Sequence, residues 1–296
     1  MAPDVLFSVV IPSYNRADFI EKTIHSILEQ YYFHFEVIVI DDGSTDDTAN
    51  VVRPLLADPR IRYYSIPNSE RGAARNVGTK HSKGEYVTFL DSDDLFLPWH
   101  LQTAYEKIVA FDRPPVFHLG YEILHSNGKV NFLPTLPSPV NQKLLEGNFL
   151  SCMGVFLKRE VAFANFFDED RQLSGSEDYE LWMRIAARYP ILTFPKVTSR
   201  LINHSDRSVV TTSAKKLIDR INVLEEKLHR DAVFMNVFGN SLRKFDSYRT
   251  LYLALHLALS GERWLAFKSL LATAMKYPAI MTNYRFPVAL KKIVFR

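Results

Sequence analysis

The chain has 296 residues, of which 47% are hydrophobic and 23% charged, so it can form one large domain with or without an appendage and is not globally disordered. Its formal net charge of +3 is too small to indicate nucleic-acid binding, and its single cysteine, Cys152, excludes an internal disulfide and fits a reducing compartment. The sequence shows neither a signal-peptide pattern nor an uncharged apolar run of transmembrane length, so we expect a cytoplasmic protein.

Residues 1–95 alternate between strand-like and helix-like patterns. This alternation predicts a parallel sheet whose strands are joined by right-handed helical crossovers. Apolar, β-branched runs predict buried strands at 7–12, 35–40, 61–66 and 86–90. Apolar residues at helical spacing predict helices at 17–30, 46–56 and 72–81.

The rest of the chain gives weaker patterns. Prolines crowd residues 112–150, which we expect to be irregular apart from a hairpin turn at 126–129. Short strands are predicted at 154–158 and 191–200, with a helix at 177–188 between them. From Ser213 onward the pattern is helical, and a helical hairpin is expected to turn at Gly261.

Polar residues gather directly after three of the predicted strands. Because the carboxyl ends of parallel strands meet at one edge, where open α/β sheets bind ligands, we expect these residues to share a site. The residues are Tyr14 and Asn15 after the first strand, Asp41 and Asp42 after the second, and Asp91, Ser92 and Asp93 after the fourth.

Each of these clusters has a chemical interpretation and a plainer one. Asp91 and Asp93 form an Asp-x-Asp motif that can hold a hard divalent cation bridging a diphosphate, or they are an acidic turn. A carboxylate at Asp42 can accept the imide N–H of a uracil or a ribose hydroxyl, or cap the next helix. Tyr14 can stack on a base or simply pack, and Asn15 can orient the loop.

Two further clusters open predicted helices. Arg71 and Arg75 suit phosphate oxygens, although surface arginines look the same in a sequence. Asp178, which follows Glu177, can act as a general base if it reaches an acceptor hydroxyl. The helix dipole alone also favours acidic residues in a first turn, and Ser174 has capping-box spacing to Glu177.

Taken together, five motifs in this order resemble family 2 inverting glycosyltransferases, from residue 6 to residue 205. The resemblance implies the A-type glycosyltransferase fold: an α/β, Rossmann-like, mostly parallel sheet with helices on both faces and a smaller acceptor-side sheet. We divide the chain into a catalytic domain at 1–212, with a nucleotide-binding half at 1–95 and an acceptor half at 96–212, and a C-terminal helical appendage at 213–296. The five motifs occupy 8–16, 37–46, 71–78, 84–94 and 177–182.

The same resemblance implies metal-dependent transfer from a nucleoside-diphosphate sugar, usually a UDP-sugar, to a saccharide or lipid-linked acceptor in polysaccharide or glycoconjugate synthesis. Mn²⁺ or Mg²⁺ would be the cofactor, held by Asp93, Asp91 and His204. Asp178 would be the catalytic base, with Glu177 and Trp182 on the acceptor or sugar side. The nucleotide-binding residues would be Pro12, Tyr14, Asn15, Asp41, Asp42, Arg71, Arg75, Asp91 and Ser92.

Two other functions compete with this interpretation. A nucleotidyltransferase would carry a glycine-rich loop after the first strand, where this chain has residues 12–15, Pro-Ser-Tyr-Asn. A non-catalytic sugar-nucleotide or glycan-binding protein stays open as the alternative, because a fold does not guarantee activity. The Asp-x-Asp and Glu-Asp clusters argue against that alternative.

The C-terminal segment is unusual in its charge. Residues 263–296 contain seven Lys or Arg and no Asp or Glu, interleaved with Trp, Phe and Leu. This composition indicates either a basic amphipathic segment in peripheral contact with an anionic membrane or a packed helical cap with a solvated basic face.

Overall fold

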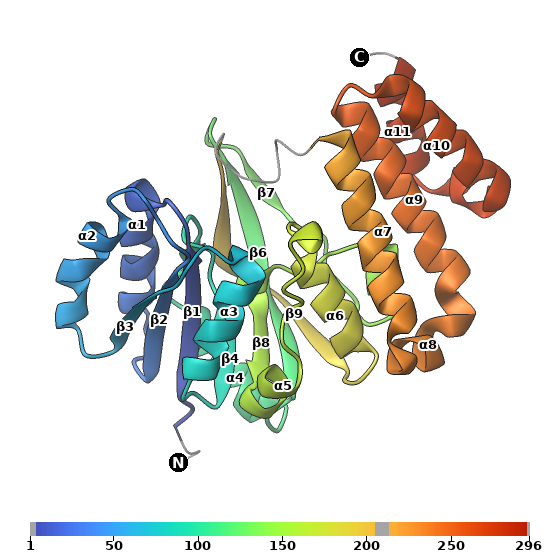
Figure 1. Cartoon of the computed structure of the whole chain (residues 1–296). Helices are drawn as coiled ribbons and strands as arrows, with labels where there is room; N and C mark the ends of the chain where they lie inside the picture. Colours follow the sequence, from blue (N-terminus) through green and yellow to red (C-terminus); the bar gives the residue numbers. More distant parts are fainter. Residues whose placement is uncertain (1–3, 205–212, 295–296) are drawn as a thin grey trace.

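Strands built from apolar, β-branched runs form the centre of the molecule, and a stack of helices lies at one end (Figure 1). The computed structural model describes residues 4–204 and 213–294. The strands in this part of the chain are β1 (Phe7–Ser13), β2 (Phe35–Asp41), β3 (Ile61–Ser65), β4 (Tyr86–Phe89), β5 (Leu95–Phe96), β6 (Val116–His125), β7 (Val130–Phe132), β8 (Val155–Lys158) and β9 (Ile191–Asn203). The helices are α1 (Ala17–Leu28), α2 (Thr48–Val52), α3 (Glu70–His81), α4 (His100–Ala110), α5 (Arg159–Ala164), α6 (Glu177–Ala186), α7 (Ala214–Arg230), α8 (Ala232–Phe238), α9 (Leu242–Leu259), α10 (Arg263–Lys276) and α11 (Arg285–Val294).

These strands form one sheet in the order β3-β2-β1-β4-β8-β6-β9-β5, with β7 paired to β6. The first four strands run parallel to one another, as predicted. β8 then pairs antiparallel with β4 and carries the sheet into the acceptor half. The mostly parallel sheet is confirmed, and the acceptor-side strands extend it rather than standing apart.

Helices cover both faces of the sheet, which confirms that prediction. On one face, Ile24 of α1 and Leu101 of α4 pack against Val9 and Val37. On the other face, Ala74 of α3 and Leu181 of α6 pack in a second core with Val10 and Ile38. Alternate residues of β1 and β2 therefore enter opposite cores, as expected of strands that are buried on both faces.

The prediction that residues 112–150 are irregular is wrong over their first part. The ten-residue strand β6 lies there and pairs in parallel with β9 along most of its length. The prolines flank this strand: Pro114 and Pro115 precede it, and Pro134, Pro137 and Pro139 follow it. The predicted turn at 126–129 is confirmed, because β6 and β7 form a hairpin around it.

The C-terminal helices begin where the sequence predicts helix, and the turn at Gly261 is confirmed between α9 and α10. Gly261 has φ of 90°, in the left-handed region that glycine adopts without a steric penalty. Leu224 and Leu228 of α7 share the core that covers α6, whereas α9, α10 and α11 form a third core. The division of the chain at residue 212 therefore stays a prediction. Within residues 4–204 and 213–294, no helix has the length and hydropathy needed to cross a bilayer.

Candidate active site

The carboxyl ends of β1, β2 and β4 lie side by side, and the loops that follow them carry most of the predicted site residues. Ser13 pairs in register with Asp41, and the N–H of Asp42 donates to the carbonyl of Ser13 at 2.8 Å. On the other side of β1, the N–H of Leu90 donates to the carbonyl of Val10 at 3.0 Å. The sheet thus brings three sequence-distant loops to one edge.

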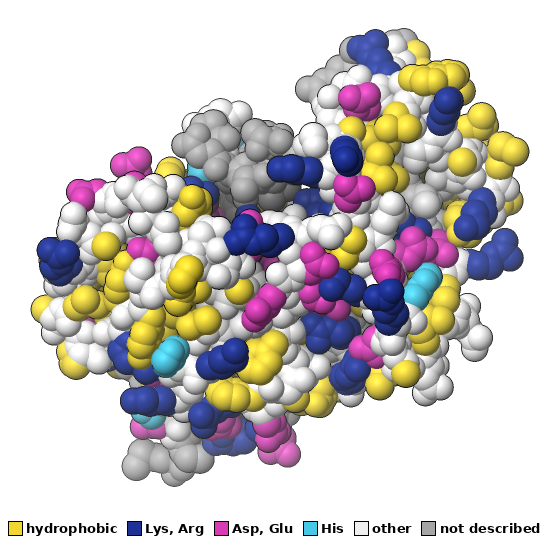
Figure 2. Space-filling view, in the orientation of Figure 1, with side chains coloured by type: hydrophobic (Ala, Val, Ile, Leu, Met, Phe, Trp, Pro, Cys, Tyr) yellow, Lys and Arg dark blue, Asp and Glu magenta, His cyan; other side chains and the backbone are white. Residues whose placement is uncertain are grey.

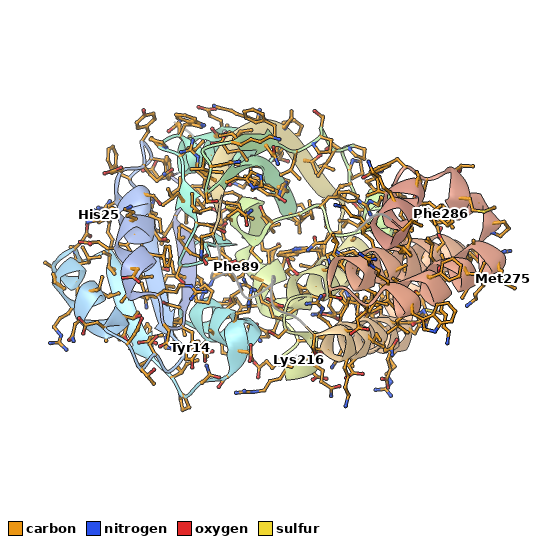
Figure 3. All side chains as sticks on the ribbon, turned by 90° about the horizontal axis from the view of Figure 1, so that it is seen from above. Tyr14, His25, Phe89, Lys216, Met275 and Phe286 are labelled. Atoms are coloured by element: carbon orange, nitrogen blue, oxygen red, sulfur yellow. The ribbon has the colours of Figure 1, made fainter. Side chains whose placement is uncertain are left out.

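Asn15 joins the loop after β1 to the loop after β2 through hydrogen bonds. Its φ of 52° lies in the left-handed region, which asparagine tolerates better than most residues. Its N–H donates to Ser44 Oγ at 2.9 Å, and its Oδ1 accepts from the N–H of Thr45 at 2.8 Å. This arrangement leaves the adjacent Tyr14 side chain 47% exposed at the edge of the site, where it can meet a base (Figure 3). The predicted contact of Pro12 with the nucleotide does not fit its side chain, which is buried within β1.

The two aspartates at the end of β2 have different surroundings. Asp41 accepts from the N–H of Ser44 at 2.8 Å through Oδ1 and from the Tyr63 hydroxyl through Oδ2, so both of its oxygens brace the loop. Asp42 Oδ1 accepts from the N–H of Ser69 at 2.6 Å. Burial raises the pKa of Asp42, and this backbone donor only partly offsets the shift. Asp41 therefore supports the loop after β2, whereas Asp42, which is equally buried and also accepts from Asn68 Nδ2 at 3.4 Å, is held by the segment that follows β3.

The Asp-x-Asp loop is held rigidly from both sides. Thr23 Oγ1 of α1 donates to the carbonyls of Ser92 and Asp94 at 3.0 Å each, and Ser92 itself is buried. Asp94 Oδ1 accepts from the N–H of Ile202 at 2.9 Å and so ties the loop to the end of β9. Because this hydrogen bond holds Ile202 at the loop, His204, two residues later, lies beside Asp93.

Asp93 lies at the centre of a small polar group. Its Oδ2 is 3.1 Å from His204 Nε2 and 3.5 Å from Arg16 Nε, and the His204 ring stacks on Phe19 with centroids 4.6 Å apart. Carboxylate oxygens with one imidazole are a donor set that Mn²⁺ accepts, and carboxylates also suit Mg²⁺. Asp93 and His204 are therefore adjacent and of types that fit the implied metal. Asp91 lies on the same loop with its Oδ1 paired to Arg75, and the three residues do not converge into one ligand group among the described residues. The sequence singled out Asp93 and His204 but not Arg16, although a cation directly after Asn15 was a usable signal.

Arg75 links the loop after β4 to the start of α6. Its side chain is almost fully buried, with Nη2 2.7 Å from Asp91 Oδ1 and Nη1 2.9 Å from Glu177 Oε1. Arg71 lies nearby, with its Nε 3.7 Å from the same Glu177 oxygen. Burial alone would raise the pKa of Glu177, but Arg71 and Arg75 more than offset this and lower it. Glu177 is therefore an ionised partner of the arginines, and Arg75 holds the β4 loop against the start of α6.

We expect the Arg75→Met variant to lower the free energy of unfolding by roughly 3–5 kcal/mol, because it leaves the buried Glu177 carboxylate without its closest cation. Urea denaturation measures this change. The matched control is Arg60→Met, which breaks the more exposed pair of Arg60 with Asp58 and should cost about 0–1 kcal/mol. Equal losses in the two variants would contradict the assigned role of Arg75.

Asp178 stands one residue beyond Glu177 in the first turn of α6. Burial, reinforced by the Glu177 charge, raises the pKa of Asp178 to about 6. Asn148 Nδ2 donates to its Oδ2 at 2.9 Å, a contact from the acceptor half that no sequence pattern indicated. Asp178 is thus a carboxylate with elevated basicity, as proton abstraction near neutral pH requires.

Two predictions about α6 need correction. Trp182 is fully buried in the core with its ring edge-on to Phe167, so its side chain is not available to an acceptor. The capping box does not form, because Ser176 is the residue that precedes the helix and Ser174 Oγ donates to Glu70 Oε2 instead. The positive φ of Gly175 turns the chain sharply between the two serines and separates Ser174 from the helix.

Arg220 of α7 reaches this turn from the C-terminal helices. Its Nη1 donates to the carbonyl of Ser174 at 3.4 Å, and a Cβ at Gly175 would lie 2.5 Å from the same nitrogen. Among the described residues, its buried Nε has no hydrogen-bond partner. The sequence could have indicated that Arg220 is buried, because it lies on the apolar face of an amphipathic helix with Leu217 and Leu224.

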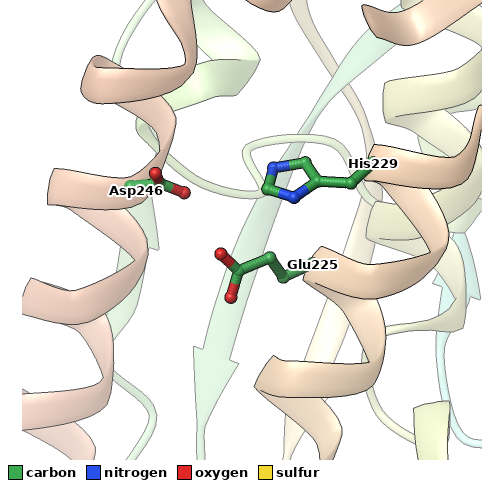
Figure 4. Close-up of side chains that lie close together, drawn as sticks. All are labelled: Glu225, His229 and Asp246. Carbon is green, nitrogen blue, oxygen red and sulfur yellow. The ribbon is translucent and has the colours of Figure 1, made fainter.

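A second group of metal-ligand types lies between α7 and α9, away from this edge. Ligand atoms of Glu225, His229 and Asp246 lie within 4.8 Å of one another (Figure 4). Arg249 Nη2 is 2.7 Å from Glu225 Oε2 and 3.8 Å from Asp246 Oδ1. Because Arg249 of α9 pairs closely with Glu225 of α7, we interpret the group as an ion-pair cluster that joins the two helices.

Comparison with known proteins agrees with this geometry. The model of the family described as glycosyl transferase family 2 matches residues 8–116. An Escherichia coli relative, named UDP-Glc:alpha-D-GlcNAc-diphosphoundecaprenol beta-1,3-glucosyltransferase WfgD, is 31% identical over 183 residues, which are 62% of this chain and 70% of that protein. An uncharacterized glycosyltransferase of Rickettsia bellii is 31% identical over 74% of this chain, which spans only 32% of that relative's length.

Solved structures share the fold at lower identity. S. aureus TarS 1–349 in complex with UDP-GlcNAc aligns with a TM-score of 0.69 and 21% identity, over 97% of this chain and 88% of that one. The mannosyltransferase PcManGT from Pyrobaculum calidifontis, in complex with GDP-Man and Mn²⁺, aligns with a TM-score of 0.60 and 20% identity, over 97% and 83% of the two chains. These likenesses confirm the expected fold. With the family model and the relatives, they lead to one assignment: the chain belongs to glycosyl transferase family 2.

Proposed function

We propose that the protein is a metal-dependent, inverting glycosyltransferase that moves a hexosyl unit from a UDP-sugar to a saccharide or lipid-linked acceptor. The observation that carries this proposal is the Arg75 bridge, which joins the Asp-x-Asp loop to the helix bearing Asp178. Its guanidinium pairs with Asp91 on that loop and with Glu177, the residue directly before Asp178. A UDP-sugar is supported by the bound UDP-GlcNAc of TarS, and a lipid-linked acceptor by the name of WfgD.

The proposed reaction follows from the residues at this edge. Asp42 and Tyr14 bind the uracil and ribose, and the Arg75–Asp91 pair fixes the loop beneath the diphosphate. Asp93, Asp91 and His204 would hold a divalent cation, which would neutralise the charge that develops on the leaving diphosphate. Asp178 takes the proton of the acceptor hydroxyl as the new oxygen–carbon bond forms and the bond to the diphosphate breaks on the opposite face. One such displacement inverts the anomeric configuration.

A donor screen tests this proposal directly. The purified protein is offered UDP-sugars and GDP-sugars with a diphosphate-linked saccharide acceptor, with Mn²⁺ and with chelator, and release of nucleoside diphosphate is measured. We expect release from a UDP-sugar that depends on the metal and the acceptor. Release of pyrophosphate from a sugar phosphate and a nucleoside triphosphate would instead indicate a nucleotidyltransferase, and binding without any release would indicate a non-catalytic protein.

The base-recognition role of Asp42 makes a separate prediction. We expect Asp42→Ala to weaken UDP binding by roughly 10- to 100-fold even in chelator, because a hydrogen bond to a charged group is lost. Isothermal titration calorimetry measures the affinity. Asp42→Asn keeps the oxygen that receives the Ser69 N–H, so it separates loss of charge from loosening of the loop. Asp58→Ala is the matched control, and unchanged UDP affinity in Asp42→Ala would argue against base recognition.

A further inference from the structure

The outer side of α10 is apolar although no part of residues 4–204 and 213–294 covers it. Its exposed apolar side chains recur at helical spacing and form one stripe, with Trp264 68% exposed and Met275 77% exposed. The opposite side of the helix holds Ala266 and Leu270, which pack in the core shared with α9 and α11. A helix that is apolar all round normally has neighbours on every side. The stripe consists of Trp264, Phe267, Leu271 and Met275.

The apolar surface continues past α10. Tyr284, between α10 and α11, is 71% exposed, and three apolar side chains of α11 also face outward. Figure 2 shows hydrophobic side chains gathered over the helices at the upper right, with Lys and Arg among them, and Figure 3 shows Met275 at the outer end of the molecule. We call this surface the C-terminal face. Beyond the α10 stripe it comprises Met281, Tyr284, Val288, Leu290 and Val294.

The C-terminal segment that carries this face is also strongly basic. All 33 Asp and Glu of the chain lie in residues 1–262 together with 29 of the 36 Lys and Arg, a net charge of −4, whereas residues 263–296 carry +7. Lys268 lies with its Nζ 5.0 Å from the Trp264 ring centroid, so a cation sits directly beside the most exposed aromatic residue of the stripe. Lys291 is exposed on α11 beside Val288 and Val294.

We propose that the C-terminal face binds the surface of an anionic phospholipid membrane. Trp and Tyr side chains have an apolar body and a polar tip, and they favour the boundary between lipid and water. Cations near an anionic membrane add an attraction that the apolar side chains alone do not give. A second copy of this chain fits the face less well, because two such faces would bring like charges together.

Flotation with lipid vesicles tests this binding in the full-length chain. Vesicles of phosphatidylcholine alone are compared with vesicles of phosphatidylcholine and phosphatidylglycerol in equal parts. We expect the protein to float with the mixed vesicles and to bind roughly tenfold or more weakly to the neutral ones. A triple variant, Trp264→Ser with Leu271→Ser and Met275→Ser, should lose flotation. The charge-reversal pair Lys268→Glu and Lys291→Glu should also lose it.

As matched controls, the same kinds of substitution are made at exposed residues outside the C-terminal face. Tyr31, Phe33 and Phe132 are as exposed as the residues of the stripe, and their serine variants should float like the unchanged protein. Lys22→Glu with Lys129→Glu controls for the charge reversal. Thermal unfolding checks that each variant is folded.

Two outcomes would overturn the proposal. One is flotation that is equal in the C-terminal and control variants, or equal on neutral and anionic vesicles. The other is a dimer in analytical ultracentrifugation that the triple variant converts to a monomer, because a second copy would then cover the face. The assay measures lipid binding and not sugar transfer, so its failure leaves the proposed function untouched.

Discussion

Asp93→Ala is expected to abolish the part of UDP binding that depends on a divalent cation. Asp93 is the carboxylate that His204 Nε2 and Arg16 Nε both approach, and it is the member of the Asp-x-Asp motif nearest to the imidazole. Without it, the hard cation loses its main oxygen ligand, so Mn²⁺ should no longer increase the affinity for UDP. Calorimetry with Mn²⁺ and with chelator should then give the same weak affinity, a loss on the order of 100-fold or more.

Two further variants serve as controls for the Asp93→Ala measurement. Asp93→Asn keeps the size of the side chain and removes its charge, so it should show the same loss if the carboxylate is the ligand. Asp47→Ala removes an exposed carboxylate that bonds only to the neighbouring Asn50 amide among the described hydrogen bonds, and it should bind UDP normally. Full metal stimulation of UDP binding in Asp93→Ala would move the metal ligand elsewhere.

The features that were predicted correctly from the sequence are those that depend on residues close together in the chain. The four parallel strands were predicted because each is a run of apolar residues, and the turn at Gly261 because glycine interrupts two helical patterns. The adjacency of the loops that carry Tyr14, Asp42 and Asp93 followed from a rule about parallel strands, which needs no knowledge of the individual contacts.

The features that were missed depend on contacts between distant parts of the chain. Glu177 bonds Arg75 across 102 positions, and no spacing rule relates two such residues. Trp182 was expected on the acceptor side because it belongs to the family motif at 177–182, but its side chain is buried in the core that α6 shares with the sheet. The prolines around β6 suggested an irregular segment. They flank the strand and do not interrupt it, so the strand forms between them.

Asp178→Asn is expected to keep donor binding and to lose transfer by roughly 10²- to 10⁴-fold, the usual contribution of a positioned general base. The amide preserves the size of the side chain and the contact with Asn148, but it cannot accept the proton of an acceptor hydroxyl. Calorimetry with UDP should match the unchanged protein, while release of UDP in the presence of acceptor should fall. Asp112→Asn, on the surface, is the matched control and should transfer normally.

The pH dependence gives this assignment an independent measure. Burial and the Glu177 charge raise the pKa of Asp178 to about 6, and only its ionised form can take a proton. In the unchanged protein, kcat/KM should therefore fall as pH decreases through about 6, and the lost activity should return as pH rises. The residual activity of Asp178→Asn should lack this acidic limb. Near-normal turnover in that variant, with the limb intact, would assign the base elsewhere. Glu177 would be the first candidate, although its lowered pKa makes it a weaker base than Asp178.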